Sequence, residues 1–259
     1  MNNSDISMDF FSLKGKNAII TGGNGGLGTA FSMAMAKAGA NVFIPSIVDD
    51  DGTTKALIEN EGVKFAFMQA DITQEGVPEQ VIKACVDTFG SVDILINCAG
   101  ICINIQDVTK FGRRAWDAMI AVNLTAAFEM SLEAAKFMIP QQSGKIINIC
   151  SLFSFLGGQW SPAYASTKHG LAGFTKAYCD ELAQFNIQVN AIAPGYYATE
   201  LTTKTRSDPD ANARVLAHIP ANRWGDTMDL MGATIFLASP ASNYVNGHLL
   251  TVDGGYMVR

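Results

Sequence analysis

The chain has 259 residues, of which 48% are hydrophobic and 16% charged, and its formal net charge is −6 at pH 7. An acidic chain without a basic run argues against nucleic acid as a partner. No run of about eighteen uninterrupted apolar residues suggests a membrane span, and the opening segment lacks the basic and apolar regions of a secretory signal. We therefore expect a cytoplasmic protein with a large core, in the size range where α/β chains often form one domain.

The cysteines and histidines show no pattern typical of a metal site. The five cysteines are scattered and mostly set in apolar segments, and no CxxC pair occurs among them. The three histidines are far apart in the sequence. Reduced, buried thiols are typical of a cytoplasmic protein, so we expect no structural metal.

Apolar runs alternate with helical patterns along the whole chain. Short β-rich runs predict strands at 16–21, 41–47, 63–70, 93–97, 145–150, 187–193 and 248–252. Apolar residues at helical spacing predict helices at 26–39, 53–60, 76–89, 114–139 and 162–183. Such alternation implies βαβ units with right-handed crossovers. The predicted fold class is α/β, a single-domain Rossmann-like doubly wound fold over residues 1–259, with about seven parallel strands flanked by helices.

The irregular part of the chain is 196–226, which is rich in Thr, Arg, Ser, Asp and Pro and includes a short helix-like piece near 210–218. It follows the carboxyl end of a predicted strand, where open α/β sheets bind their ligands. An insertion of this length is typical of a substrate lid. A plain surface excursion is the alternative.

A glycine-rich turn, TGGNGGLG at 21–28, lies between the first predicted strand and the first predicted helix. Glycines at such a turn let the backbone approach a pyrophosphate, and the helix N-terminus favours its negative charge. The position between strand and helix therefore predicts dinucleotide binding.

A tyrosine and a lysine stand four positions apart at Tyr164 and Lys168, inside the predicted helix 162–183. At that spacing both side chains lie on one face of the helix. A free phenol is almost fully protonated at neutral pH, and an ammonium close beside it favours the phenolate. The pair would then exchange protons near physiological pH. Ser151, thirteen positions before the tyrosine, ends a predicted strand and could reach the same substrate oxygen.

These features occur together in an order that resembles the short-chain dehydrogenase/reductase family. The glycine spacing of the first turn differs from the commonest dinucleotide fingerprint and is similar to the spacing in that family. NCAG at 97–100 resembles the family's Asn-Asn-Ala-Gly turn, with Cys98 as a departure in the second place, and AVNL contains the helix asparagine, Asn123. The other matches are Ser151, Tyr164, Lys168, Pro194, Gly195 and Thr199.

The resemblance implies four catalytic residues, Asn123, Ser151, Tyr164 and Lys168. Tyr164 would exchange the proton with a substrate oxygen, Ser151 would hydrogen-bond that oxygen, and Lys168 would also bind the nicotinamide ribose. Asn123 would hold a water that links the lysine to solvent, or alternatively would satisfy a buried backbone group. Ser154 lies near Ser151, but its spacing to the tyrosine fits the family less well.

The cofactor-binding residues that the resemblance implies follow the sheet from its glycine turn to the segment after the sixth strand. Asp71 and Ile72 would meet the adenine, and the turn at 97–100 would line the cofactor channel. The full set is Gly22, Asn24, Gly26, Leu27, Gly28, Ser46, Asp71, Ile72, Asn97, Ala99, Gly100, Tyr164, Lys168, Pro194, Gly195, Tyr197 and Thr199.

The end of the second predicted strand bears on the choice between NAD and NADP. An NAD enzyme is expected to carry an acid there for the ribose hydroxyls, and this chain has Ser46 instead. No Lys or Arg lies within 22–28 or 46–52 to bind a 2′-phosphate, whereas Asp49, Asp50 and Asp51 would repel one. The sequence therefore favours NAD over NADP.

The substrate prediction rests on a closer resemblance to the sugar-acid branch of the family, which includes gluconate and keto-deoxy-gluconate dehydrogenases. The segments that carry it are IINICSLFSFLGG, NAIAPGYYATEL, IPANRWGDTMDLMG and VDGGYMVR. An arginine should then meet the substrate carboxylate, and Arg206 and Arg223 are candidates, although either could make an ordinary ion pair. Gln159 and Trp160, in the loop between Ser151 and Tyr164, could face the pocket or belong to the core.

Two other functions stay open at this point. One is the same chemistry on another carbonyl, such as a polyol or an oxoacyl thioester, and the other is a non-catalytic nucleotide-binding protein. The family resemblance also implies a homotetramer. Its larger interface would be formed by the helices at 114–139 and 162–183 and its other interface by the C-terminal segment. The small residues Ala126, Ala127, Ala134 and Ala135 suit close packing between subunits, although a buried core would look alike.

Overall fold

The computed structural model describes residues 7–259 and contains one seven-stranded sheet with the strand order β3-β2-β1-β4-β5-β6-β7. Every neighbouring pair of strands is parallel, which confirms the predicted fold class. The strands are β1 Asn17–Ile20, β2 Asn41–Ser46, β3 Phe65–Gln69, β4 Ile94–Asn97, β5 Gly144–Ile149, β6 Ile187–Pro194 and β7 Leu249–Val252.

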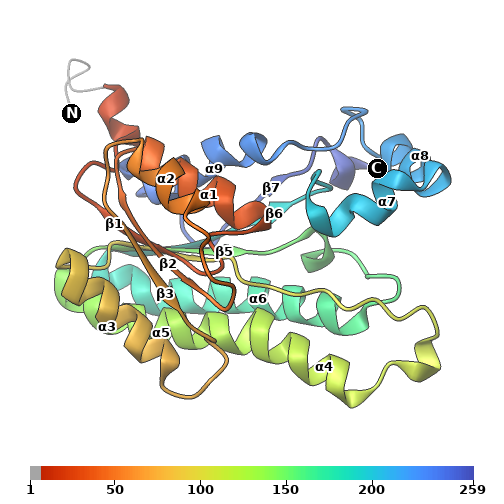
Figure 1. Ribbon diagram of the computed structural model, residues 1–259, viewed down its shortest axis with the longest axis horizontal. Coiled ribbons are helices and arrows are strands. Elements are labelled where there is room, and N and C mark those ends of the chain that lie inside the picture. The colour runs from red at the N-terminus through yellow and green to blue at the C-terminus, as the bar shows by residue number, and fades with distance from the viewer. Residues whose placement is uncertain (1–6) are drawn as a thin grey trace.

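Helices cover both faces of this sheet (Figure 1). One layer holds α1 Gly26–Lys37, α2 Thr53–Glu59 and α9 Met231–Ala238. The other layer holds α3 Val77–Phe89, α4 Arg113–Ile120, α5 Ala126–Gln141 and α6 Pro162–Leu182. The central strands β1, β4, β5 and β6 are buried along their whole length, as expected for a parallel sheet covered on both faces. The helix α9 was not predicted, because its sequence MGATIFLA is apolar almost all round and shows no helical stripe.

The predicted helix at 114–139 is interrupted in the structure. A π turn at Ala121–Thr125 separates α4 from α5. By length and composition the segment Arg113–Gln141 is long and apolar enough to cross a membrane, since an 18-residue window within it has a mean hydropathy of 1.2. Its inner face nevertheless packs on the sheet as a core helix does, with Ala126 and Ala134 fully buried.

A polar network crosses the core beside the middle of the sheet. Asn97 Nδ2 donates to Asn148 Oδ1 and to Ser131 Oγ, each at 2.9 Å, and thereby joins β4 to β5 and α5. Asn148 Nδ2 in turn donates to Thr175 Oγ1 of α6 at 2.9 Å. These bonds join the carboxyl ends of β4 and β5 to α5 and α6, although Asn97 Oδ1 itself has no partner among the described residues.

The segment after β6 contains two short helices, α7 Thr203–Ser207 and α8 Pro209–His218. The helix predicted near 210–218 is therefore present, and α7 is an addition to it. Asp208 begins α8 by accepting hydrogen bonds from the backbone N–H groups of Asp210 and Ala211, both at 3.0 Å. Figure 1 shows both helices projecting beyond the carboxyl ends of the strands, near the C-terminus.

Candidate active site

The glycine turn after β1 forms a cradle at the start of α1. Gly22 and Gly26 have φ values of 65° and 51°, a region that favours glycine. A Cβ on Gly28 would collide with the carbonyl oxygen of Gly22, whereas nothing lies within 4 Å of a Cβ on Gly25 or Gly26. No side chain caps the first N–H groups of α1. An open surface above an uncapped helix N-terminus fits a pyrophosphate.

The turn after β4 lies against this cradle. Thr21 Oγ1 accepts hydrogen bonds from Cys98 N at 2.9 Å and from Ala99 N at 3.0 Å. A Cβ on Gly22 would be 3.5 Å from Ala99 Cα, so the two turns touch. Thr21 is the first residue of the glycine turn, and the sequence did not identify it as the residue that holds the second turn in place. Burial raises the pKa of the Cys98 thiol to about 12, so the cysteine in this turn remains protonated.

Two predicted cofactor residues, Asn97 and Asp71, already have hydrogen-bond partners for their side chains. Asn97 is 5% exposed, and its amide belongs to the core network described above. Asp71 accepts hydrogen bonds from Thr73 N at 3.0 Å and Thr73 Oγ1 at 2.7 Å, and these bonds hold the pKa of its carboxyl below the ordinary value. Ile72 is also buried. The side chains of Asn97 and Ile72 are therefore buried, whereas Asp71 is half-buried and its carboxylate stays at the surface.

The region after β2 differs from the crowded acidic site that we expected. The two carboxylate oxygens of Asp50 accept from the backbone N–H groups of Thr54 and Lys55, both at 3.2 Å, at the start of α2. Asp51 likewise accepts from Thr53 N at 2.9 Å. These bonds turn both carboxylates toward α2, so the repulsion of a 2′-phosphate is weaker than the sequence suggested.

A small neutral surface therefore marks the end of β2. Ser46 is buried, and its hydroxyl accepts from Val48 N at 3.3 Å. Asn24 Nδ2 donates to Val48 O at 2.9 Å, which joins the glycine turn to the loop after β2.

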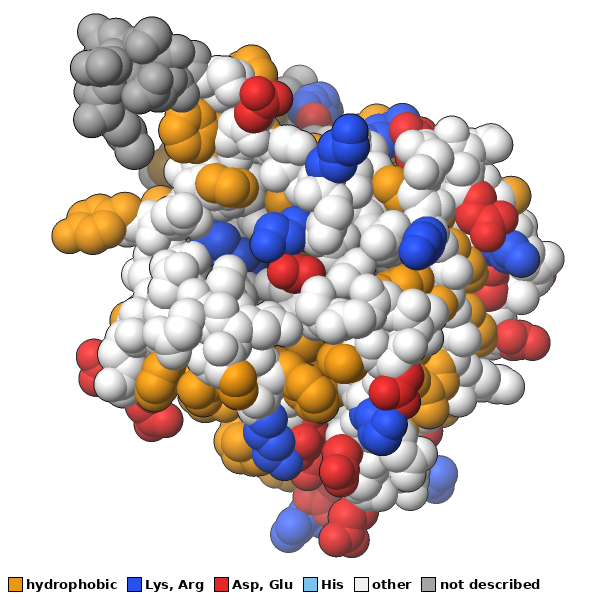
Figure 2. Space-filling model, turned by 90° about the vertical axis from the view of Figure 1, so that its left-hand side faces the viewer, with side chains coloured by type: hydrophobic (Ala, Val, Ile, Leu, Met, Phe, Trp, Pro, Cys, Tyr) orange, Lys and Arg blue, Asp and Glu red, His pale blue; other side chains and the backbone are white. Residues whose placement is uncertain are grey.

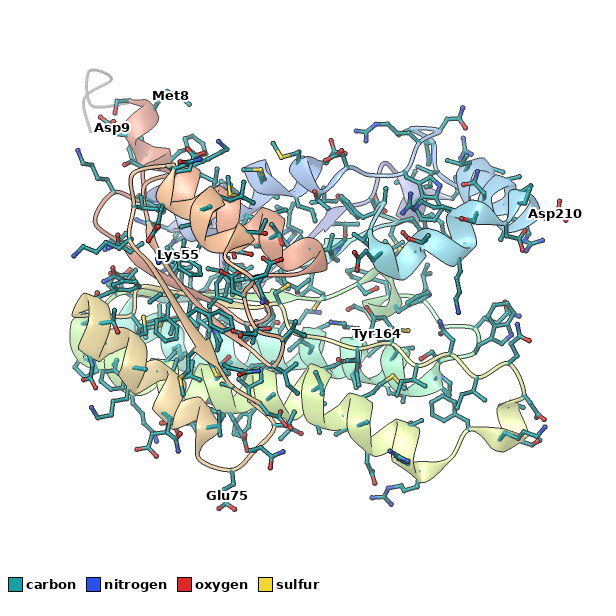
Figure 3. All side chains as sticks on the ribbon, in the orientation of Figure 1. Met8, Asp9, Lys55, Glu75, Tyr164 and Asp210 are labelled. Atoms are coloured by element: carbon teal, nitrogen blue, oxygen red, sulfur yellow. The ribbon has the colours of Figure 1, made fainter. Side chains whose placement is uncertain are left out.

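Ser151, Tyr164 and Lys168 lie at the carboxyl edge of the sheet. Lys168 Nζ is 5.5 Å from the centroid of the Tyr164 ring and donates to Ile149 O at 2.6 Å. Figure 3 labels Tyr164 on the part of α6 that lies below the helices α7 and α8. The lysine side chain is buried, whereas Ser151 and Tyr164 are half-buried. The structure thus brings the three predicted residues to one edge.

Ser151 and Ser154, near the end of β5, use their hydroxyl groups differently. The hydroxyl of Ser154 donates to the backbone carbonyl of Lys168 at 2.8 Å and is buried. The hydroxyl of Ser151 only accepts, from Phe153 N at 3.2 Å, so its proton is available to a substrate oxygen. The geometry favours Ser151 over Ser154 as the substrate-facing hydroxyl.

Asn123 lies in the π turn between α4 and α5, a kind of turn found frequently at functional sites. Its Oδ1 accepts from Ile101 N and its Nδ2 donates to Ile101 O, both at 2.8 Å. A Cβ on Gly100 would be 3.3 Å from Asn123 Oδ1 and 3.9 Å from Lys168 Nζ. The Asn123 side chain therefore satisfies the backbone N–H and C=O groups of Ile101, which is the alternative role that the sequence allowed. Gly100 brings it close to Lys168 at the same time.

The residues after β6 that were predicted to bind the cofactor differ in their surroundings and exposure. Pro194 ends β6, and a Cβ on Gly195 would be 2.6 Å from Asp253 Cα. Tyr197 is 5% exposed and its hydroxyl donates to Val252 O at 2.9 Å, so its ring is a packing group and not a cofactor contact. Thr199 begins a short helical turn and its carbonyl accepts from Arg206 Nη2 at 3.0 Å.

Of the candidate substrate residues, two are exposed and the two arginines already have hydrogen-bond partners. Gln159 and Trp160 are exposed, and Trp160 has a φ of 67°, an uncommon backbone conformation for a bulky residue. Arg206 is folded onto the uncharged Thr199 carbonyl, whereas Arg223 pairs through both terminal nitrogens with Asp229 at 2.6 and 3.0 Å. A cavity of about 250 Å³ beside Arg223 and Tyr197 is lined by none of the three catalytic candidates.

Comparison with known proteins gives a consistent result. A family model described as short chain dehydrogenase matches residues 16–210. The chain is 73% identical over 254 residues to the uncharacterized oxidoreductase YgcW of Escherichia coli (strain K12), covering 98% of this chain and 97% of that protein. It is 43% identical over 253 residues to a 2-dehydro-3-deoxy-D-gluconate 5-dehydrogenase of Bacillus subtilis (strain 168), covering 97% and 98%.

A solved structure extends the comparison to three dimensions. The crystal structure of a gluconate 5-dehydrogenase from Burkholderia cenocepacia J2315, in complex with NADP and tartrate, is 36% identical with a TM-score of 0.90. The match covers 97% of this chain and 98% of that one.

Proposed function

The chain belongs to the short-chain dehydrogenase family and is one of its nucleotide-dependent oxidoreductases, and from this premise we propose that it interconverts a secondary alcohol and a ketone on a sugar acid. The proposed substrate is of the gluconate or keto-deoxy-gluconate type. Relatives that carry such names cover nearly the whole chain, including residues beyond the 16–210 match of the family model. The observation that carries the proposal is the Lys168 ammonium 5.5 Å from the Tyr164 ring, beside the free hydroxyl of Ser151.

In this proposal the bound nicotinamide nucleotide supplies or accepts the hydride. Tyr164 gives its phenolic proton to the substrate oxygen in reduction and takes it back in oxidation. Ser151 donates a hydrogen bond to the same oxygen and stabilises the charge that develops on it. Lys168, held by Ile149 O at 2.6 Å, keeps a positive charge beside the phenol. The residues therefore orient the reactants and move one proton.

For the cofactor we propose a site that accepts NAD and NADP with similar efficiency. Ser46 and Asn24 present a neutral surface at the end of β2, and neither rejects a phosphate. Asp50 and Asp51 are turned to the start of α2, although no Lys or Arg within 22–28 or 46–52 is present to favour the phosphate. We expect kcat/KM values for the two nucleotides within about tenfold of each other, which corresponds to about 1.4 kcal/mol.

Arg206 is the proposed contact for the substrate carboxylate. Its guanidinium is held by neutral acceptors, Thr199 O at 3.0 Å and Thr202 Oγ1 at 3.3 Å, which a carboxylate can replace with a stronger charged bond. Arg223 already makes a charged pair with Asp229 and would have to give it up. The segment 196–226 that carries Arg206 would act as the substrate lid.

A panel of aldonates and keto-deoxy-aldonates, assayed with both nucleotides by nicotinamide absorbance, tests the proposed function. Tyr164→Phe should lower kcat by about 10²- to 10⁴-fold, the range for loss of a proton-transfer group, while nucleotide binding is retained. Tyr178→Phe removes a hydroxyl from the same helix, away from the catalytic residues, and should leave kcat unchanged.

Each alternative function predicts a different result in this panel. Turnover of neutral polyols or thioesters alone would overturn the sugar-acid assignment. Undiminished turnover in Tyr164→Phe would overturn the proton-transfer role, and nucleotide binding without any turnover would indicate a binding protein.

A further inference from the structure

A second cavity, of about 130 Å³, opens at the amino edge of the sheet, opposite the edge that carries Tyr164. We call it the amino-edge cavity; its wall includes Ser12, Lys16, Asp93, Lys145, Gln188 and Asn243. Figure 2 shows this side of the molecule, with basic side chains next to an acidic one in a hollow near its centre. A cavity of this size is large enough for a small ligand, since one water needs only about 10–15 Å³ on the same measure.

The charges around the amino-edge cavity do not balance. Asp93 accepts from Lys16 Nζ at 3.1 Å, from Asn17 N at 3.0 Å and from Ser91 Oγ at 2.9 Å, so both of its carboxylate oxygens already have partners. Within the part of the chain that the structure describes, the partners of Lys145 Nζ are both neutral, Ser242 Oγ at 3.3 Å and Asn243 Oδ1 at 2.9 Å. Among the residues that line the cavity, two ammonium groups thus face one carboxylate.

Lys145 is the unusual member of this group because it is 9% exposed and has no acidic partner among residues 7–259. Buried lysines are normally paired with an opposite charge. Burial lowers the pKa of Lys145 to about 8, and no neighbouring carboxylate opposes the effect. At neutral pH the side chain therefore remains mostly protonated, in a place where an anion would relieve the cost of burying it.

We propose that the amino-edge cavity binds a small oxyanion, a phosphate or a carboxylate, between Lys145 and Lys16. Gln188 lies on the wall with its amide only weakly held, at 3.4 Å from Asn186 Oδ1, and the Ser12 hydroxyl lies on the same wall. Amide and hydroxyl groups supply the neutral donors that complete an oxyanion site. A bound anion would link β5, which carries Lys145, to Asn243 and to the segment before β1. It would stabilise the fold from the edge opposite the reaction.

Isothermal titration of the full-length protein with inorganic phosphate, at pH 7 and constant ionic strength set with chloride, tests this proposal. The wild-type protein should bind one phosphate per chain saturably, and Lys145→Met should weaken binding at least about tenfold, the loss of about one charged hydrogen bond. Lys16→Gln, a change at an exposed lysine, should also weaken it. Lys83→Gln, at an exposed lysine on α3, is the matched control and should bind as the wild-type protein does.

A parallel titration with acetate separates the two ligand chemistries. Tighter binding of phosphate assigns the site to phosphate groups, and tighter binding of acetate assigns it to carboxylates. The absence of saturable heat with either anion would overturn the proposal. Equal affinity in the wild-type protein and in Lys16→Gln would also overturn it, because that variant leaves the buried lysine and the fold intact.

Discussion

Two buried lysines, Lys168 and Lys145, lie at opposite edges of the sheet, and their hydrogen-bond partners explain their different roles. Lys168 Nζ donates to a strand-end carbonyl at 2.6 Å and stands beside a phenol ring that faces the cleft. Lys145 Nζ donates to a hydroxyl and an amide at the start of the strands. In our proposals the first charge serves proton transfer, whereas the second makes the protein sensitive to pH and to anions.

Lys145 should make the free energy of unfolding rise with pH above about 8. Its pKa is lowered from 10.5 to about 8 in the folded protein, so between these values the unfolded chain holds a proton that the folded chain has released. Stability therefore increases with pH across this window, by no more than about 3 kcal/mol at about 1.36 kcal/mol per pH unit. Urea denaturation in phosphate-free buffer from pH 7 to 10.5 measures it.

The comparison variant for this series is Lys145→Met, which removes the titrating group and keeps an apolar stem of similar length. The difference in unfolding free energy between the two proteins isolates Lys145 from other groups, such as the Cys85 and Cys98 thiols, whose pKa values of about 12 act in the opposite direction. A difference that stays constant with pH would show that Lys145 is fully solvated.

At the residue scale, the sequence predicts which residues form the site better than it predicts where their side chains point. Spacing predicts that Ser151, Tyr164 and Lys168 come together at a strand end and one helix face, and the family resemblance then identifies them as the catalytic candidates. The inward turn of the Tyr197 side chain depends on Val252, 55 positions away, whose carbonyl accepts from the tyrosine hydroxyl. Contacts at that separation leave no local pattern, so the sequence could not show that this side chain was already engaged.

At the scale of elements, the turn between β1 and α1 is the part with least room for change. Gly28→Ala should destabilise the protein by about 1–3 kcal/mol or more, the cost of overpacking, because its Cβ would collide with the Gly22 carbonyl. It should also lower nucleotide affinity, since the cradle must open. Thermal denaturation and fluorescence titration with NADH measure the two effects.

Gly25→Ala is the matched control for this change. Gly25 has an extended φ of −147° and nothing lies within 4 Å of its Cβ position, so the midpoint of unfolding should remain that of the wild-type protein. Equal destabilisation by both substitutions would show that helix entry, and not the contact at Gly28, limits this turn.

The elements that the sequence predicts best are those with a clear period or a clean apolar run. All seven strands were predicted within a few residues, since parallel strands buried on both faces read as apolar runs. The sequence missed α7, which is only five residues long, α9, which lacks a polar face, and the π turn at Ala121–Thr125. A π turn adds one residue to a helical turn and barely changes the spacing of apolar residues, so the sequence did not predict it. In the structure the Asn123–Ile101 hydrogen bonds mark its position.

At the scale of the whole molecule, the surface of α5 and α6 corrects one detail of the predicted assembly. The alanines at 126, 127, 134 and 135 face the core and are buried, so they cannot form an interface. The outer face instead carries Phe128 and Leu132, which are 43% and 38% exposed. Phe174 packs edge-on against Phe128 with ring centroids 5.9 Å apart, and Tyr178 stacks on Phe174 at 4.9 Å.

We expect a homotetramer in which these apolar side chains are covered, since contiguous exposed apolar surface commonly marks a contact between proteins. The double substitution Phe128→Glu and Leu132→Glu should place charges in that contact and reduce the mass to that of a dimer or monomer. Light scattering coupled to gel filtration measures the mass. Val108→Glu changes an exposed side chain elsewhere, 76% exposed, and should leave the mass unchanged. A monomeric wild-type protein would contradict the prediction.

The helix α6, Pro162–Leu182, carries the reacting phenol near its beginning and the stacked aromatic pair near its end. About 21 Å of axis separates Tyr164 from Tyr178, at about 1.5 Å per residue. Because a helix of this length moves as one rigid body, a change that tilts the end with Tyr178 also displaces the end with Tyr164. Substitutions far from the proposed site can therefore alter its geometry if they shift the helix axis, without any contact with a substrate.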